Sequence, residues 1–246
     1  MPFSTLSLST HGPLAVIHLN RPDQGNPVDE ALLDDLDAAS VVIADDPSVS
    51  VVQLTAEGTL FSRGWSGPPP ASGRLPFRSL ERLPQPVLAC VSGDAVGAGL
   101  ELALACDLRI ATAAAHFTMP LPAADAAWLG AQRLPRLIGR GRAAEMLLLG
   151  GPISAATARA WGLVNAIAAD RVDLADLAGR LTQTIASRSP LALRYAKEAI
   201  AQGLEMPLEQ ALRYETDLTV ILQTTADRAE GVRAFMEKRP PHFTGR

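Results

Sequence analysis

Hydrophobic residues in the first half of the chain alternate between short unbroken runs and helical spacing. Apolar residues recur three or four positions apart over 29–44, and a second helix is expected over 100–106. Asp29 or Asp34 could cap the start of the first helix. Short apolar runs typical of strands occupy 14–19 and 87–91, and further strands are expected at 49–54, 108–112 and 116–119. This alternation of strands and helices predicts an α/β core with parallel strands.

The second half of the chain is helical in pattern, and no further strands are expected after about residue 140. Asp227 and Glu230 have the spacing of a capping box at the start of the last helix. Apolar stripes on these helices favour packing against a neighbouring subunit. The expected helices are 141–149, 154–162, 172–187, 190–203, 207–224 and 228–238.

Composition and charge narrow the class of protein. Of the 246 residues 48% are hydrophobic, and the formal net charge is −4, which gives no general attraction to nucleic acid. The two cysteines, Cys90 and Cys106, make neither a disulfide framework nor a zinc pattern, so no metal is expected. No window approaches the ~18 apolar residues of a membrane span, and the N-terminus lacks a signal-peptide pattern. We therefore expect a cytoplasmic protein with no membrane partner.

Small residues crowd the junction between the strand at 87–91 and the helix that follows. At positions 97–99 the chain reads Gly-Ala-Gly, and Glu101 follows inside an apolar run. The first N–H groups of a helix have no intrahelical partner and can bind a carbonyl oxygen on which negative charge develops. Glu101 would lie beside that oxygen and could move a proton or orient water. The alternative is that the glycines serve the turn and Glu101 is a capping charge.

The run 93–103, continued by 105–109, resembles the signature of the crotonase superfamily, the enoyl-CoA hydratases and isomerases. Further stretches resemble the family in the same order along nearly the whole chain. They are Asn20-Arg21-Pro22 with Asn26, Phe61-Ser62-Arg63-Gly64, Gln132-Arg133-Leu134-Pro135, Gly162-Leu163-Val164-Asn165 and Phe235 to Pro241. Each stretch is weak alone, but their joint order is specific.

The resemblance implies a spiral of ββα units over residues 1–190, holding an acyl-CoA site, and a helical oligomerisation region over 191–246. It also implies a homotrimer or a dimer of trimers. The substrate would be an acyl-CoA thioester, with coenzyme A as part of the substrate and no metal or redox cofactor. By position in the family motif, the main-chain N–H groups of Trp65 and Ala98 would form the oxyanion hole. Glu101 matches one catalytic glutamate.

The sequence departs from the family pattern at the second catalytic glutamate, where it has Leu121. Loss of one carboxylate from an acid/base pair costs on the order of 100-fold. Asp125 is either a displaced second acid or a loop or N-cap carboxylate. Three functions therefore stay open: an isomerase, hydrolase or slow hydratase with Glu101 as single base, a decarboxylase that uses the oxyanion hole, or a non-catalytic acyl-CoA-binding subunit.

Other residues are candidates for substrate binding. Gly64 and Gly97 belong to the two oxyanion loops, and Trp128 could cap the acyl chain or pack a surface loop. The candidates for contact with the CoA phosphates are Arg21, Arg63 and Lys238. For each of these three cations, a solvated surface charge is the alternative.

Overall fold

The computed structural model describes residues 3–68, 70, 74–120 and 130–246. Within these residues the main sheet has the strand order β1-β2-β3-β4-β6-β9, and only the pair β1–β2 is antiparallel. A smaller sheet has the order β5-β7-β8. The strands are β1 (Leu6–His11), β2 (Leu14–Leu19), β3 (Val51–Ala56), β4 (Val87–Val91), β5 (Ala95–Val96), β6 (Leu108–Thr112), β7 (His116–Thr118), β8 (Ile153–Ser154) and β9 (Ala166–Ala168).

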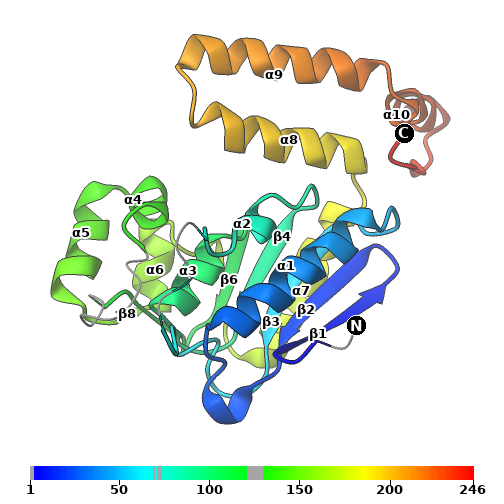
Figure 1. Cartoon of the computed structure of the whole chain (residues 1–246). Coiled ribbons are helices and arrows are strands. Elements are labelled where there is room, and N and C mark those ends of the chain that lie inside the picture. The colour runs from blue at the N-terminus through cyan, green and yellow to red at the C-terminus, as the bar shows by residue number, and fades with distance from the viewer. Residues whose placement is uncertain (1–2, 69, 71–73, 121–129) are drawn as a thin grey trace.

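Helices cover the main sheet and then continue away from it (Figure 1). The helices of the first part are α1 (Glu30–Asp45), α2 (Arg78–Glu81), α3 (Ala98–Leu104), α4 (Arg133–Ile138), α5 (Arg140–Leu149), α6 (Ala155–Trp161) and α7 (Arg171–Ala186). Those of the last part are α8 (Pro190–Gly203), α9 (Leu208–Gln223) and α10 (Ala226–Glu237). The α/β class with a helical C-terminal region is confirmed.

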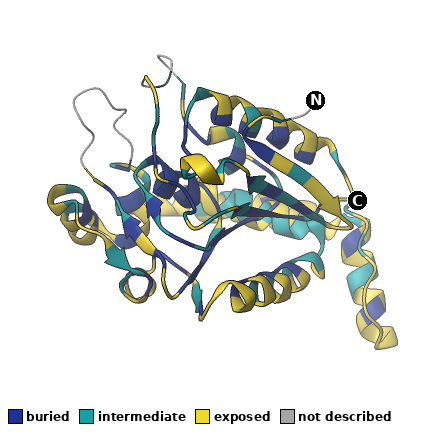
Figure 2. Ribbon diagram, turned by 90° about the horizontal axis from the view of Figure 1, so that it is seen from below, coloured by how far each residue is buried: buried dark blue, intermediate teal, exposed yellow. Residues whose placement is uncertain are grey.

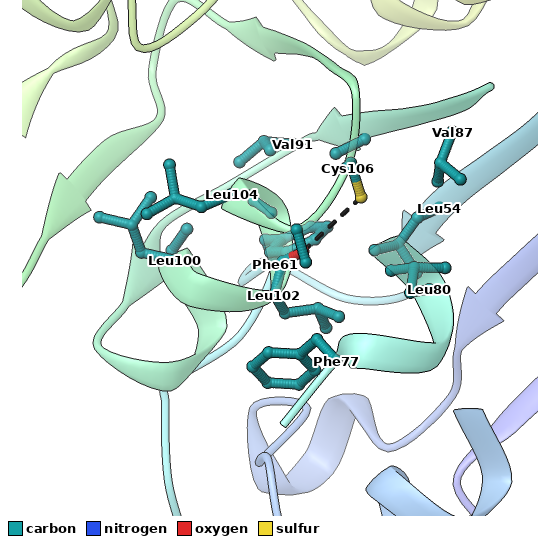
Figure 3. Packing of buried hydrophobic residues seen from close by; sticks show 14 of the residues in the cluster. Leu54, Phe61, Phe77, Leu80, Val87, Val91, Leu100, Leu102, Leu104 and Cys106 are labelled. Atoms are coloured by element: carbon teal, nitrogen blue, oxygen red, sulfur yellow. Dashed lines mark hydrogen bonds between the residues drawn. The ribbon is translucent and has the colours of Figure 1, made fainter. Parts of the chain in front are cut away.

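The two faces of strand β4 are buried in different clusters, as its wholly apolar sequence requires. Leu88 and Cys90 pack with Leu174 and Ala178 of α7. Residues 87, 89 and 91 face the larger core, which includes α1 and α3. Figure 3 shows this core from close by, with Phe61, Phe77, Leu80 and the leucines of α3 packed together. The helix that carries Glu101 is therefore fixed by the larger core, and all of its residues are buried.

Helix α1 begins where the sequence predicts. The side chain of Asp29 accepts a hydrogen bond from the Leu32 N–H at 2.9 Å and so caps the helix. The residues that face the core recur at helical spacing; they are Leu32, Leu33, Leu36, Ala39 and Ile43. Asp34 lies inside the helix and is not the cap.

The last three helices lie apart from the sheet (Figure 1). Lys197 of α8 donates to Asp107 Oδ2 at 2.7 Å and to the Gln85 carbonyl at 3.1 Å, which ties this region to the core. Figure 2, coloured by burial, shows mostly buried strands at the centre of the molecule and exposed residues on the helices around them. On α8, α9 and α10 the exposed residues include large apolar side chains, namely Ile200, Leu204, Leu208, Leu212, Val220, Ile221, Val232, Phe235 and Met236. None of the helices in the described ranges combines the length and apolar character needed to cross a membrane.

The prediction that strands stop near residue 140 is wrong. Strands β8 and β9 lie within that part of the chain, and β9 pairs in parallel with β6 at the edge of the main sheet. They contain two and three residues, which is too short for an alternating pattern to emerge between helices. Strand β1 was missed for another reason: most of its Ser- and Thr-rich sequence is exposed at the opposite edge.

The predicted capping box at α10 is also wrong. Thr225 caps this helix by accepting a hydrogen bond from the Arg228 N–H at 3.2 Å. Asp227 is instead buried, and its carboxylate accepts from Ser189 Oγ at 2.6 Å and from the Thr244 N–H at 2.7 Å. It therefore fastens the C-terminal tail to the start of α8.

Candidate active site

Two loops, 61–65 and 94–98, run side by side next to the start of α3. Ser62 and Ala95 form an isolated parallel bridge. The Ser62 N–H donates to the Asp94 carbonyl at 3.2 Å, and the Val96 N–H donates to the Ser62 carbonyl at 3.0 Å. Trp65 and Ala98 each follow this bridge by three residues, so the pairing brings their backbones into the same neighbourhood.

Glycines allow the two loops to approach this closely. A Cβ on Gly99 would lie 2.5 Å from Ser62 Oγ and 2.8 Å from the Ser62 carbonyl oxygen. A Cβ on Gly64 would lie 2.8 Å from the Val96 carbonyl oxygen and 3.8 Å from the Ala98 nitrogen, and φ of Gly64 is +100°. Side chains would therefore clash at both positions, and Gly64 also adopts a backbone conformation that L-residues avoid. The close approach explains the small residues at the strand–helix junction.

The two amides predicted for the oxyanion hole are not used in the hydrogen bonding of the described residues. In the parallel bridge between Val28 and Trp65, the Val28 N–H donates to Gly64 and the Ser66 N–H donates to Val28. The N–H of Trp65 therefore points away from Val28. Ala98 is the first residue of α3, where an N–H has no intrahelical acceptor. Neither amide donates a hydrogen bond to another residue in the described ranges.

Glu101 lies in the first turn of α3 and is only 1% exposed. Its Oε2 accepts a hydrogen bond from Arg133 Nη1 at 2.8 Å. Its Oε1 is buried and has no hydrogen-bond partner among the described residues. Arg133, the first residue of α4, also donates from Nε to Glu81 Oε1 at 2.6 Å and from Nη2 to the Pro76 carbonyl at 3.1 Å. One guanidinium group therefore joins two carboxylates from different helices.

The environment moves the pKa values of these two carboxyl groups in opposite directions. Burial raises the pKa of Glu101 above its ordinary range, the Arg133 cation opposes this shift, and the negative charge of Glu81 adds to it. Burial alone would also raise the pKa of Glu81, but the hydrogen bond and charge of Arg133 outweigh it and leave that pKa lowered. Such a divided pair is typical of a site in which one group exchanges protons and the other stays charged.

A cavity of about 440 Å³ opens at Glu101. Its described lining comprises Leu75, Pro76, Arg78, Glu81, Glu101, Gly130, Ala131, Gln132, Arg133, Arg136 and Glu205. Arg78 donates to Glu81 Oε2 at 3.0 Å, and Arg136 lies 3.6 Å from Glu205. Trp65 and Ala98 are not among the described residues that line this cavity, so it reaches Glu101 from the side of Arg133.

The other predicted site residues lie at different places in the structure and not together at the cavity. Gly97 caps α3 with φ +50°, and its N–H donates to the Thr118 carbonyl at 2.8 Å. Arg63 is exposed and donates to Ser66 Oγ at 3.1 Å, while Lys238 lies at the C-terminal end of α10. Neither cation lines the described cavity, and their proposed contacts with CoA stay predictions. Leu121, Asp125 and Trp128 lie outside the described residues.

Arg21 is engaged within the fold. Its guanidinium donates to both carboxylate oxygens of Asp29, at 2.6 and 2.9 Å, and to the Pro27 carbonyl at 2.8 Å. The side chain is 16% exposed. Arg21 therefore fixes the loop that leads into α1 and is not a solvated surface charge, while its proposed contact with CoA stays a prediction.

Sequence reasoning missed Glu81 and Arg133 as site residues. Arg133 belongs to the stretch Gln132-Arg133-Leu134-Pro135, but no role was assigned to it there. Glu81 is one of several charged residues before β4. Arg133 follows Glu101 by 32 positions and Glu81 by 52 positions in the sequence. No local spacing could therefore have connected the three residues. In the described part of the chain, no three His, Cys, Asp or Glu side chains cluster as ligands for a metal ion.

Burial of the Glu101 charge predicts a pH-dependent cost to stability. Because the folded-state pKa is raised above the ordinary value of 4.5, this group stabilises the fold at low pH and loses that contribution as the pH rises through its folded pKa. Glu101→Gln, which cannot ionise, should therefore melt at a higher temperature than the parent at pH 7. Thermal unfolding from pH 4 to pH 8 should show this gain shrinking towards pH 4.

The exposed Glu145→Gln on α5 is the matched control and should show no gain that grows with pH. A lower melting temperature of Glu101→Gln at pH 7 would mean that attraction to Arg133 outweighs burial, contrary to this account.

Comparison with known proteins agrees with the sequence signature. The profile of the family "Enoyl-CoA hydratase/isomerase" matches residues 72–246. The chain is 38% identical over 255 residues to (E)-benzylidenesuccinyl-CoA hydratase of Thauera aromatica, with 98% of each chain covered. It is 36% identical over 259 residues to 2,3-dehydroadipyl-CoA hydratase of Escherichia coli K12, with 99% of this chain and 100% of the relative covered.

A solved structure gives the same result for the fold. The enoyl-CoA hydratase of Bacillus anthracis superposes with a TM-score of 0.89 at 35% identity, and 99% of this chain and 100% of that chain are covered. The predicted crotonase-like architecture is confirmed. The chain belongs to the enoyl-CoA hydratase/isomerase family of enzymes.

Proposed function

We propose that this protein binds an acyl-CoA thioester and stabilises its enolate form through the N–H groups of Trp65 and Ala98. The observation that carries the proposal is that these two amides lie on loops joined by the Ser62–Ala95 bridge and donate to no described residue. When a proton leaves the α-carbon, negative charge moves to the thioester oxygen. Two fixed donors at that oxygen favour the charged state over the neutral one.

Glu101 is the proposed acid/base. Its Oε1 is buried without a described partner, and burial raises its pKa above that of an ordinary glutamate, which makes it a stronger base once it is ionised. The chemistry requires no metal or redox cofactor, since coenzyme A arrives with the substrate. Cys90 and Cys106 take no part as nucleophiles, because burial raises the pKa of each thiol to about 12.

The absence of the second family glutamate favours reactions that need one base. Isomerisation of a double bond can use Glu101 alone, because the same carboxyl group can remove and return the proton. Hydration would need Asp125 as a displaced second acid, which stays a prediction. Decarboxylation or hydrolysis of an acyl-CoA on the same oxyanion hole, and acyl-CoA binding without turnover, are the alternatives that the experiments below separate.

The cavity next to Glu101 favours an acyl group with a polar end. Its described wall carries charged side chains of both signs, whereas its apolar residues are few. The charged residues are Arg78, Arg133, Arg136, Glu81, Glu101 and Glu205, and the apolar ones are Leu75, Pro76 and Ala131. A long alkyl chain would gain little from such a wall, because apolar burial is what stabilises it. The names of both relatives given above describe acyl groups derived from dicarboxylic acids, succinyl and adipyl.

The exposed apolar surface of α8, α9 and α10 supports assembly into a homotrimer or a dimer of trimers. Side chains such as Leu204, Leu208 and Phe235 are more than 70% exposed in the single chain. An apolar surface of this kind is typical of a subunit interface. The region 191–246 would then serve oligomerisation.

Removal of one amide donor tests the oxyanion hole. Ala98 is the first residue of α3, a position that tolerates proline, so Ala98→Pro deletes the N–H while allowing the helix to start. We expect kcat to fall by about 100- to 1,000-fold in a steady-state assay with enoyl-CoA. Ala226→Pro, at the first residue of α10, is the matched control and should keep the parent rate. Equal rates for the two variants would contradict the proposed hole.

Glu101→Gln separates catalysis from binding. A proton-transferring Glu101 predicts that kcat falls by at least about 100-fold while the Kd for CoA changes little, because the side chain keeps its size. The assay panel should include enoyl-, malonyl- and haloacyl-CoA. Tight binding of CoA without turnover of any panel member by the parent protein would instead favour the non-catalytic alternative.

Two substrates of equal chain length test the polarity of the acyl cavity. Hex-2-enoyl-CoA and 2,3-dehydroadipyl-CoA both carry six acyl carbons and differ in the terminal carboxylate. We expect the dehydroadipyl thioester to have the higher kcat/KM, since Arg136, which is 58% exposed and 3.6 Å from Glu205, can pair with its carboxylate. A preference for the hexenoyl thioester would contradict the proposal of an acyl group with a polar end. It would not bear on the proposed oxyanion hole.

A further inference from the structure

We propose that Arg133 and Glu81 are positioning residues for Glu101: Glu81 fixes the Arg133 guanidinium, which holds one oxygen of Glu101 and leaves the other free to exchange the proton. This inference rests on the proposed function of Glu101. It assigns roles to two side chains whose function no local sequence pattern indicates. The three residues come from α2, α3 and α4, which meet at the cavity.

The guanidinium of Arg133 is held on three sides. Nε donates to Glu81 at 2.6 Å, Nη1 donates to Glu101 at 2.8 Å, and Nη2 donates to the Pro76 carbonyl at 3.1 Å. Because the guanidinium is planar, three such bonds fix both its position and its plane. Glu81 is itself secured, since its second oxygen accepts from Arg78 Nη1 at 3.0 Å.

This arrangement leaves Glu101 with one available oxygen. Arg133 takes Oε2, whereas Oε1 is buried and has no partner among the described residues. A buried carboxylate without a cationic neighbour would become protonated and lose its capacity as a base. A carboxylate that already accepted hydrogen bonds at all of its lone pairs would have no site left for a proton from substrate. The single bond from Arg133 avoids both outcomes.

Glu81 is needed to hold the Arg133 guanidinium in place. Without it, the guanidinium could move together with the Glu101 carboxylate and would not fix its position. With two carboxylate partners, the guanidinium lies between them and its pKa is raised, although burial by itself would lower it. The other charged groups that line the described cavity are Arg78 on α2, Arg136 on α4 and Glu205 after α8. Arg136 and Glu205 are paired with each other at 3.6 Å and are more exposed than Arg133. Arg133 and Glu81 are therefore the charges expected to dominate at Glu101.

The two positioning residues should shift the titration of Glu101 in opposite directions. Arg133→Gln removes the cation that lowers the pKa of Glu101, so the acid limb of the pH–kcat/KM profile should move to higher pH. Glu81→Gln removes an anion that raises that pKa and leaves Arg133 to pair with Glu101 alone, so the limb should move to lower pH. Both variants should lose roughly 10- to 100-fold in kcat from misplacement of Glu101.

Arg133→Lys separates charge from geometry. Lysine keeps the positive charge, but it lacks the planar fork that reaches both carboxylates. The acid limb should therefore stay near that of the parent protein, while kcat remains reduced. Arg140→Gln and Glu145→Gln, two exposed charges on α5, are the matched controls and should leave both rate and limb unchanged.

A readout without turnover makes the test independent of the substrate. Carbon-13 NMR of the full chain labelled at glutamate follows each carboxyl group, and the Glu101 signal is the one missing from Glu101→Gln. Opposite shifts of its titration in Arg133→Gln and Glu81→Gln support the proposal, and unchanged titration in both overturns it. If Arg133→Gln does not fold, Glu81→Gln and Arg133→Lys decide by the same criterion.

The outcomes also distinguish this inference from the proposed function. Loss of turnover in Glu101→Gln together with unchanged titration in the other variants would overturn the positioning roles alone. A parent protein that turns over no acyl-CoA would overturn the proposed function, while shifted titrations would still show that Arg133 and Glu81 control the charge of Glu101.

Discussion

The close approach of two backbone segments is the constraint on which the site depends. The loop 61–65 and the loop 94–98 share a ladder of hydrogen bonds, and side chains at Gly64 or Gly99 would collide with the opposite loop. Because glycine has no side chain, the two loops can approach until the amides of Trp65 and Ala98 lie near one another. Neither amide then donates a hydrogen bond to the described part of the sheet or helix. Main-chain donors are well suited to this task, because the fold that surrounds them holds them rigid before any ligand arrives.

The same part of the molecule carries an ionisable group, Glu101, at the edge of the larger apolar core. Glu101 sits in a seven-residue helix whose residues are all buried, and the larger apolar cluster beside β4 fixes that helix in place. A buried carboxylate weakens a fold unless something compensates for its desolvation. Arg133 supplies part of that compensation, but the raised pKa indicates that a net cost of burying the charge remains. Local instability at such a position is typical of a group retained for chemistry.

Much of this could be predicted from the sequence, and the exceptions have physical causes. Strand β4 and helix α8 were predicted with their observed bounds, because one is an unbroken apolar run and the other starts at a proline. Helix α3 begins two residues before its predicted start, since small residues such as Ala98 and Gly99 carry little hydrophobic signal although they are helical. The very short strands β8 and β9 depend on tertiary pairing and left no local pattern.

The site likewise contains residues that the sequence indicates and residues that it does not. Glu101 could be found because it is a lone charge in an apolar run and belongs to a family signature. The roles of Glu81 and Arg133 could not, because they arise from contact between three helices that are distant in sequence. Side-chain identity also does not reveal that the Trp65 and Ala98 amides have no partner among the described residues, because they are main-chain groups. These two residues were identified by their positions in the family motif. Burial of Arg21 against Asp29 likewise depends on the turn that precedes α1.

The most direct test of the account is a crystal structure of the protein with a bound acyl-CoA that does not turn over, such as acetoacetyl-CoA. The account predicts that the thioester oxygen lies within about 2.7–3.2 Å of both the Trp65 and the Ala98 nitrogen, with Glu101 Oε1 facing the α-carbon. A thioester oxygen bound elsewhere, or two amides that point in different directions, would contradict it.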